Sequence, residues 1–117
     1  MSDIPDFNEA ELWNLQTTLK ERFREEKQVE LVETELRLDP HSTQLTPCPA
    51  AYWQHGDCHF VIAKTDAERY RPFFFYRVHQ MFGTGIEEFD NLTECTVTLL
   101  QVQADHEARR REEEGAG

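Results

Sequence analysis

The sequence predicts an α+β domain, in which a three- or four-stranded antiparallel sheet carries N-terminal and C-terminal helices packed on one face. Three observations predict this class. Apolar residues recur at helical spacing near both ends of the chain, β-prone segments lie between them, and glycines and prolines separate those segments. A length of 117 residues is typical of one domain, which we expect to span residues 1–117 with short frayed ends at about 1–5 and 113–117.

A helix is predicted over residues 6–27. Its apolar stripe consists of four residues at steps of three and four, namely Leu12, Leu15, Leu19 and Phe23. Two alternative capping signals precede the stripe, because a short polar residue is followed three positions later by a glutamate both at Asp6 with Glu9 and at Asn8 with Glu11.

Strands are predicted in the middle of the chain, at residues 29–38, 52–55, 58–64 and 73–82. Gly56-Asp57 joins the second and third as a type II′ hairpin, since glycine accepts a positive φ at the first turn position. Residues 39–49 contain three prolines and are predicted as a loop. Thr65–Glu68 matches the sequence pattern of a capping box, which favours one helical turn before Pro72.

The last segment is predicted as a helix over residues 91–112, because apolar residues keep helical spacing and Asn91 with Glu94 offers a cap. Its threonines favour a strand at 95–102, which remains the alternative. The predicted core residues are Leu12, Leu15, Leu19, Phe23, Val32, Leu36, Phe60, Ile62, Phe74, Tyr76, Val78, Leu92, Leu99 and Val102.

The charge of the chain argues against several classes of partner. Its net charge is −11, distributed as −6 in residues 1–39, +1 in residues 40–85 and −6 in residues 86–117. Such a charge repels phosphate backbones and anionic lipid surfaces, so nucleic acid and membrane partners are not expected. The first residues lack a basic region followed by an apolar one, so no signal peptide is expected and the predicted location is the cytosol.

The strongest cluster of reactive side chains is the predicted hairpin, where His55 and Cys58 face each other across the turn and share one side of the sheet. This pair supplies two of the four ligands that zinc needs, so both residues are only weak metal candidates and no metal or other cofactor is predicted. Cys58 and His59 are adjacent in a strand and face opposite sides, which excludes a nucleophile–base pair between them. Without another catalytic motif, an enzyme is not the leading interpretation.

The leading functional prediction is a small acidic cytosolic protein-binding module, such as an adaptor, a chaperone-like protein or a regulatory subunit. Two helices cover one face of the sheet, so aromatic residues on the other face would form an apolar interface. A homodimer is the expected way to cover this face, and a second protein is the alternative. The predicted interface residues are Trp53, Phe73, Phe75 and Arg77. The alternatives are an acidic mimic of nucleic acid that binds a basic partner, and a small metal-binding protein or enzyme that uses His55 and Cys58.

Overall fold

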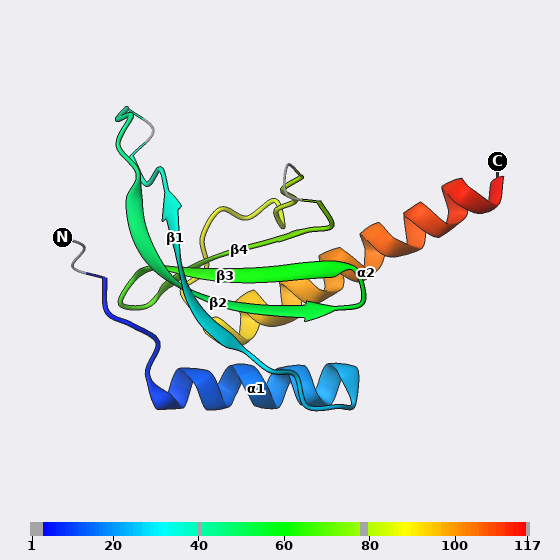
Figure 1. Cartoon of the computed structure of the whole chain (residues 1–117), viewed down its shortest axis with the longest axis horizontal. Helices are drawn as coiled ribbons and strands as arrows, with labels where there is room; N and C mark the ends of the chain where they lie inside the picture. The colour runs from blue at the N-terminus through cyan, green and yellow to red at the C-terminus, as the bar shows by residue number, and fades with distance from the viewer. Residues whose placement is uncertain (1–3, 40, 78–79, 117) are drawn as a thin grey trace.

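The computed structural model describes residues 4–39, 41–77 and 80–116 and confirms the α+β class (Figure 1). Its four strands form one antiparallel sheet in chain order, and Figure 1 shows α2 behind this sheet and α1 along its lower border. The elements in chain order are α1 (Glu9–Phe23), β1 (Glu30–Leu36), β2 (Thr46–His55), β3 (Cys58–Asp66), β4 (Arg69–Phe75) and α2 (Leu92–Ala116).

The cap of α1 decides between the two predicted signals. Asn8 Oδ1 accepts a hydrogen bond from the Glu11 N–H at 2.8 Å, and Glu11 Oε1 accepts one from the Asn8 N–H at 2.9 Å. This reciprocal pair is a capping box, so the helix begins at Glu9 and not at residue 6. The helix ends at Phe23, earlier than predicted, because Arg24 adopts the left-handed conformation with φ 57° and ψ 28°.

The β2–β3 hairpin has the predicted geometry. Gly56 has a φ of 63°, whereas Asp57 does not have a positive φ, which is the pattern of a type II′ turn. The turn pairs His55 with Cys58 and therefore Trp53 with Phe60. Residues that are paired directly share one face of the sheet, so the turn fixes which side chains of both strands face the helices.

The loop predicted at residues 39–49 is shorter than expected, because β2 begins at Thr46 and includes Pro47 and Pro49. Both prolines pair with β1, and the pairing of β2 with β3 begins only at Ala50. The missing N–H of each proline therefore points to the side of β2 that β3 does not reach. Prolines are tolerated in a strand where no ladder bond is lost, which is why the proline count misled the sequence prediction.

Two further predictions in the middle of the chain are wrong. Thr65–Glu68 does not form a helical turn, because β3 runs to Asp66 and β4 begins at Arg69. The strand predicted at 73–82 starts earlier and ends at Phe75, since the chain then leaves the sheet and returns to pair Phe82 with Phe74. Val78, a predicted core residue, lies outside the described residues.

The last segment is a helix, so the alternative strand at 95–102 is wrong. Asn91 Oδ1 accepts from the Glu94 N–H at 2.9 Å, and the buried Thr96 hydroxyl donates to the Leu92 carbonyl at 2.8 Å. These hydrogen bonds satisfy the Thr96 hydroxyl and the Glu94 N–H within the helix. The β propensity of threonine does not take such local bonds into account. The helix extends to Ala116, beyond the predicted end, and no helix in the described ranges is both long and apolar enough to cross a membrane.

The core lies between the helices and one side of the sheet, which we name the covered face. Trp53, Phe60 and Phe74 come from three adjacent strands and place their rings in succession, 5.3 Å and 6.4 Å apart between centroids. All three are at most 1% exposed. The helices contribute further fully buried residues to this cluster, namely Leu15 and Leu19 from α1 and Cys95 and Leu99 from α2.

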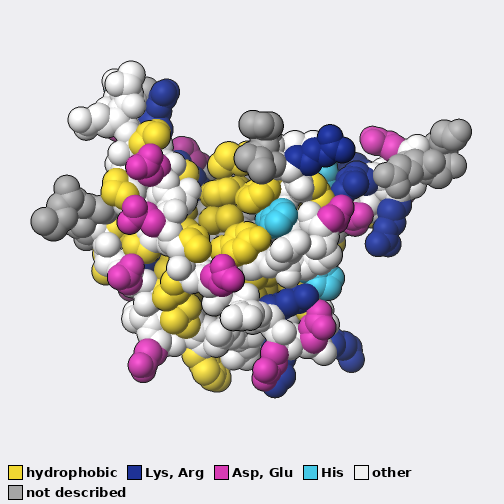
Figure 2. Space-filling model, viewed as in Figure 1, with side chains coloured by type: hydrophobic (Ala, Val, Ile, Leu, Met, Phe, Trp, Pro, Cys, Tyr) yellow, Lys and Arg dark blue, Asp and Glu magenta, His cyan; other side chains and the backbone are white. Residues whose placement is uncertain are grey.

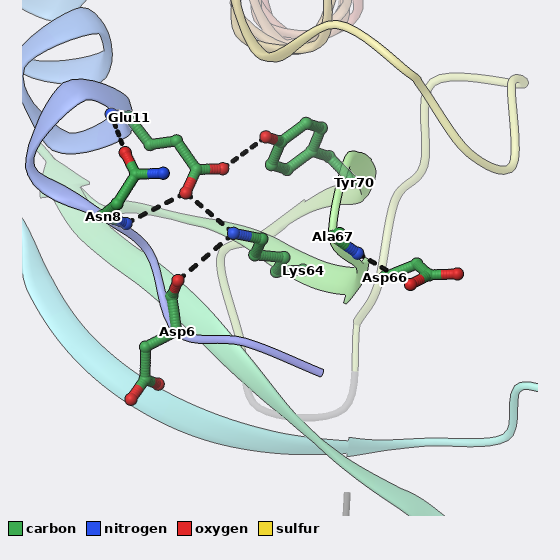
Figure 3. Close-up of polar contacts among 7 residues, drawn as sticks. All are labelled: Asp6, Asn8, Glu11, Lys64, Asp66, Ala67 and Tyr70. Carbon is green, nitrogen blue, oxygen red and sulfur yellow. Dashed lines mark hydrogen bonds and ion pairs between the residues drawn. The ribbon is translucent and has the colours of Figure 1, made fainter. Parts of the chain in front are cut away.

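A buried ion pair joins α1 to the covered face (Figure 3). Lys64 Nζ of β3 lies 2.7 Å from Glu11 Oε1, and the two side chains are 3% and 12% exposed. Lys64 also donates to the Asp6 carbonyl at 3.2 Å, and the Tyr70 hydroxyl donates to Glu11 Oε2. Burial alone would raise the pKa of Glu11, but the hydrogen bonds from Lys64, Tyr70 and the Asn8 backbone outweigh it and lower that pKa.

Leu15→Ala tests the packing of α1. Leu15 has no exposed surface, so its truncation leaves a cavity against the sheet and should lower the free energy of unfolding by roughly 2–4 kcal/mol. Urea denaturation of both chains measures the difference. Leu31→Ala is the matched control, because Leu31 is 53% exposed and its loss should cost well under about 1 kcal/mol. Equal costs for the two substitutions contradict the packing.

Glu11→Gln tests the buried ion pair, because glutamine keeps the capping box but removes the charge that faces Lys64. We expect a loss of about 3–5 kcal/mol from the free energy of unfolding, since Lys64 is left buried and unpaired. The double variant Glu11→Gln/Lys64→Met should recover at least half of this loss. Additive costs in the double-mutant cycle would show that the two charges do not interact.

The same pair predicts a pH dependence. The pKa of Glu11 is lower in the folded chain than its ordinary value of 4.5, so the pair contributes its full stability above pH 4.5 and loses it as the pH falls through the lowered pKa. In wild-type protein the free energy of unfolding should therefore drop on the acid side of pH 4.5. This drop should be smaller in Glu11→Gln. An equally large drop in both chains contradicts the assignment of the pH dependence to Glu11.

Candidate binding surface

The side of the sheet that faces away from the helices forms a second surface, which we name the open face. Side chains alternate across each strand, so the strand register determines its members. They are Glu30, Val32, Thr34 and Leu36 from β1, Cys48, Ala50 and Tyr52 from β2, His59, Val61 and Ala63 from β3, and Arg71, Phe73 and Phe75 from β4.

The floor of the open face consists of small or buried apolar side chains. Cys48, Ala50 and Ala63 are at most 1% exposed, and they cluster with the buried side chains of Leu36 and Phe73. Figure 1 shows β1 and β2 bending upward at one end of the sheet. The open face therefore has an apolar floor of mostly small side chains.

A row of three parallel rings crosses the open face from β2 to β4. The rings of Tyr52 and His59 have centroids 5.9 Å apart and planes within 17°, and those of His59 and Phe75 are 4.9 Å apart and within 15°. Tyr52 Oη lies 2.6 Å from His59 Nδ1, so a hydrogen bond fixes the first two rings relative to each other. All three side chains are half-buried, and each therefore presents part of its ring to solvent.

Beside this row lies an apolar depression of about 350 Å³. Leu36 and Phe73 line it from the sheet, and residues 81–87 form its opposite wall. Met81 and Ile86 in that wall are 63% and 50% exposed. Figure 2 shows hydrophobic side chains gathered at the centre of the face seen in Figure 1, with charged side chains around them. Leu36 and Phe73, which line the depression, belong to the same apolar cluster on which Tyr52 and Phe75 of the ring row pack.

The two edges of the sheet differ. The backbone of Tyr70 in β4 exchanges two hydrogen bonds with Phe89, at 2.9 and 2.8 Å, and that of Phe74 exchanges two with Phe82, at 3.0 and 2.9 Å. Segment 82–89 therefore closes the edge of β4 at two points. Arg71 Nη2 supports this segment from the open face, 3.4 Å from Glu87 Oε1 and 3.8 Å from Glu88 Oε2. Along β1, by contrast, the only pairing in the described ranges is with β2.

The predicted interface residues do not all lie on this surface. Phe73 and Phe75 belong to the open face, as expected. Trp53 instead lies on the covered face, 1% exposed, because the hairpin pairs it with Phe60. Arg77 is exposed but follows the end of β4, where it borders a depression with Tyr76 and with Arg110 of α2. The structure therefore retains two of the four predicted residues on the open face.

Tyr52, His59 and Val32 belong to the open face although the sequence analysis did not assign them to it. For Tyr52 and His59, the hairpin register already indicates the open face. When His55 pairs with Cys58, Tyr52 and His59 lie on the side of the sheet opposite to Trp53. Val32 was predicted as core, but it is 41% exposed, because β1 is an edge strand of the sheet.

The weak metal candidates lie at the other end of the sheet, on the covered face. His55 stacks on Phe23 at 4.2 Å between ring centroids, and its pKa is lowered, chiefly by burial and also by nearby Lys27. Burial raises the pKa of Cys58 to about 12, so its thiol stays protonated and is a poor ligand and nucleophile. Within the described ranges, no three His, Cys, Asp or Glu side chains lie close enough together to hold a metal ion.

No protein-family model, curated protein sequence or solved structure matches this chain. The functional inference therefore starts from the open face and its edges.

Two adjacent phenylalanines test the assignment of faces. Phe74→Ala on the covered face should cost about 3–5 kcal/mol of unfolding free energy, because a side chain that is 1% exposed leaves a cavity. Phe75→Ala on the open face should cost clearly less, about 1–2 kcal/mol, because its side chain is only partly buried. Chemical denaturation of both variants gives the comparison. A larger cost for Phe75→Ala contradicts an open, solvent-facing sheet.

Proposed function

We propose that this chain is a cytosolic protein-binding module without a cofactor, and that it binds an extended segment of another protein at the open face. The observation that carries the proposal is the partly exposed ring row of Tyr52, His59 and Phe75 near an apolar depression. Contiguous apolar surface of this kind is unfavourable in water and is typical of interaction sites. Aromatic side chains held in place by neighbours also lose little entropy when a partner covers them.

Charge supports a protein over a nucleic acid as the partner. Aromatic rows on a sheet can stack on bases, but nucleic-acid sites surround them with cations that neutralise phosphates. Here Glu30 of β1 lies on the open face, and Arg71 of that face is already near two glutamates.

The cellular location is part of the proposal. Cys48, Cys58 and Cys95 are all buried as free thiols, a state that a reducing compartment preserves. A homodimer is the other way to cover an apolar face, and we rank it second because each copy would bring an acidic β1 to the contact. Adaptor, chaperone-like and regulatory roles all require such a surface, and the identity of the partner decides among them.

Site-specific photo-crosslinking in cells tests the surface. A photoreactive phenylalanine is placed at Val32 on the open face or, as matched controls, at Trp13 of α1 or Val97 of α2, which are 71% and 53% exposed. We expect an adduct of defined mass from position 32 and none from the two controls. The adduct should disappear when Phe75→Glu is added, while circular dichroism shows that the fold persists.

Three other results contradict the proposal. Adducts from the helix positions alone would place the interface on the helices. An adduct of twice the mass of the chain, supported by light scattering, would identify a second copy as the occupant. Equal adducts from all three positions would indicate contact without a defined surface.

A further inference from the structure

We infer that the partner binds by strand addition: a segment that alternates basic and apolar residues pairs antiparallel with the open edge of β1 and extends the sheet. This inference rests on the proposed function and names the chemistry of the partner. Three features of β1 carry it, namely its unpaired backbone edge, the direction of its free backbone groups, and the alternation of its exposed side chains.

The pairing pattern shows which backbone groups of β1 are free. In a two-residue hairpin the residues that flank the turn form a hydrogen-bonded pair, so His55, Trp53 and Ala51 direct their backbone groups toward β3. Their even-numbered neighbours in β2 therefore bond to β1. Ala50 and Cys48 of β2 therefore bond to Val32 and Thr34 of β1.

It follows that Leu31, Glu33 and Glu35 direct their N–H and C=O groups away from β2, toward the outer edge. The prolines support the same assignment, because Pro49 and Pro47 lie opposite Glu33 and Glu35 and have no N–H to donate. No other backbone or side-chain group of the described residues bonds to this edge. A row of outward amides and carbonyls is the template that strand addition uses.

The side chains of β1 specify the added segment. Glu33 and Glu35 project on the helix side of the sheet, where both are exposed, so residues placed directly opposite them should be lysine or arginine. Val32 and Leu36 project on the open face, so the alternate residues of the segment should be apolar and extend that face. Opposite residues 32–36 the segment therefore alternates basic and apolar residues with the period of a strand.

The charges also argue against a second copy at this edge. In the fully overlapping antiparallel register, Glu33 of one copy lies opposite Glu33 of the other, and in the next register Glu33 lies opposite Glu35. Like charges directly opposite each other destabilise a strand pair. Glutamates on an edge strand thus oppose self-association and at the same time favour a basic segment.

Binding of synthetic peptides to the full chain tests the inference by fluorescence anisotropy. The probe is a heptapeptide of alternating Lys and Val, blocked at both ends, and its control has the same composition with all lysines first. We expect the alternating peptide to bind at least about tenfold more tightly, because only it presents both faces in register. N-methylation at its lysines should abolish binding, since their amides face β1, whereas N-methylation at its valines should leave binding intact.

Charge-reversal variants test the contribution of the edge. Glu33→Lys/Glu35→Lys should weaken binding of the alternating Lys–Val peptide by at least about tenfold. The matched control, Glu21→Lys/Glu112→Lys, makes the same change in net charge on the exposed surface of the helices and should change binding by less than about twofold. Amide hydrogen exchange adds a geometric readout, because the peptide should slow exchange at Leu31, Glu33 and Glu35 and leave Val32 and Thr34 unchanged.

The remaining outcomes overturn the inference in distinguishable ways. Equal binding of the two peptide orders, or equal weakening by the two charge-reversal pairs, would mean non-specific attraction. Binding that is lost in Phe75→Ala without protection of the β1 amides would place the segment across the open face, which overturns strand addition but leaves the proposed function standing. Protection of these amides at high protein concentration without peptide would identify a second copy at the edge.

Discussion

Side chains alternate across a strand, so two helices on one side of a sheet cover only every second residue. Trp53, Phe60 and Phe74 take the covered positions and are almost fully buried. Tyr52, His59 and Phe75 then necessarily face the other way, and their rings stack along the strands instead of against a helix. The remaining floor is built mostly from small residues, which reduce the apolar surface that water must cover. The open face is thus a direct result of how the core is built.

Lys64 is a buried charge on the covered face, and the ion pair that neutralises it positions α1. Lys64 is buried among apolar residues, where an unpaired ammonium would be very unfavourable. Glu11 pairs with it, accepts from Tyr70 and also completes the helix cap, so one carboxylate ties the first turn of α1 to β3 and β4. Apolar packing has little directionality, whereas these bonds tolerate only one placement of the helix end. The pair therefore specifies geometry more than it adds stability.

The sequence predicts those features that depend on local chemistry. The Asn8 capping box, the Gly56 turn and the spacing of Leu15 and Leu19 all reflect near neighbours, and each is present in the structure. Features that depend on distant pairing were missed. The prolines of β2 fit because the pairing of β2 with β3 ends before them, and Val32 is exposed because, among the described residues, β1 pairs only with β2. Trp53 lies on the covered face because the hairpin pairs it with Phe60, and alternation along one strand alone does not show which face is covered.

The closed edge of β4 limits what assemblies this sheet can form. Growth into a fibre requires every subunit to offer two open edges, one for each neighbour, because a head-to-tail contact must repeat. Segment 82–89 already occupies the edge of β4 at Tyr70 and Phe74. A subunit that accepts a strand at β1 therefore has no second open edge at β4 for the next subunit. Any assembly built by strand pairing of this folded sheet is finite, a property that protects an acidic protein with an exposed apolar face from polymerisation.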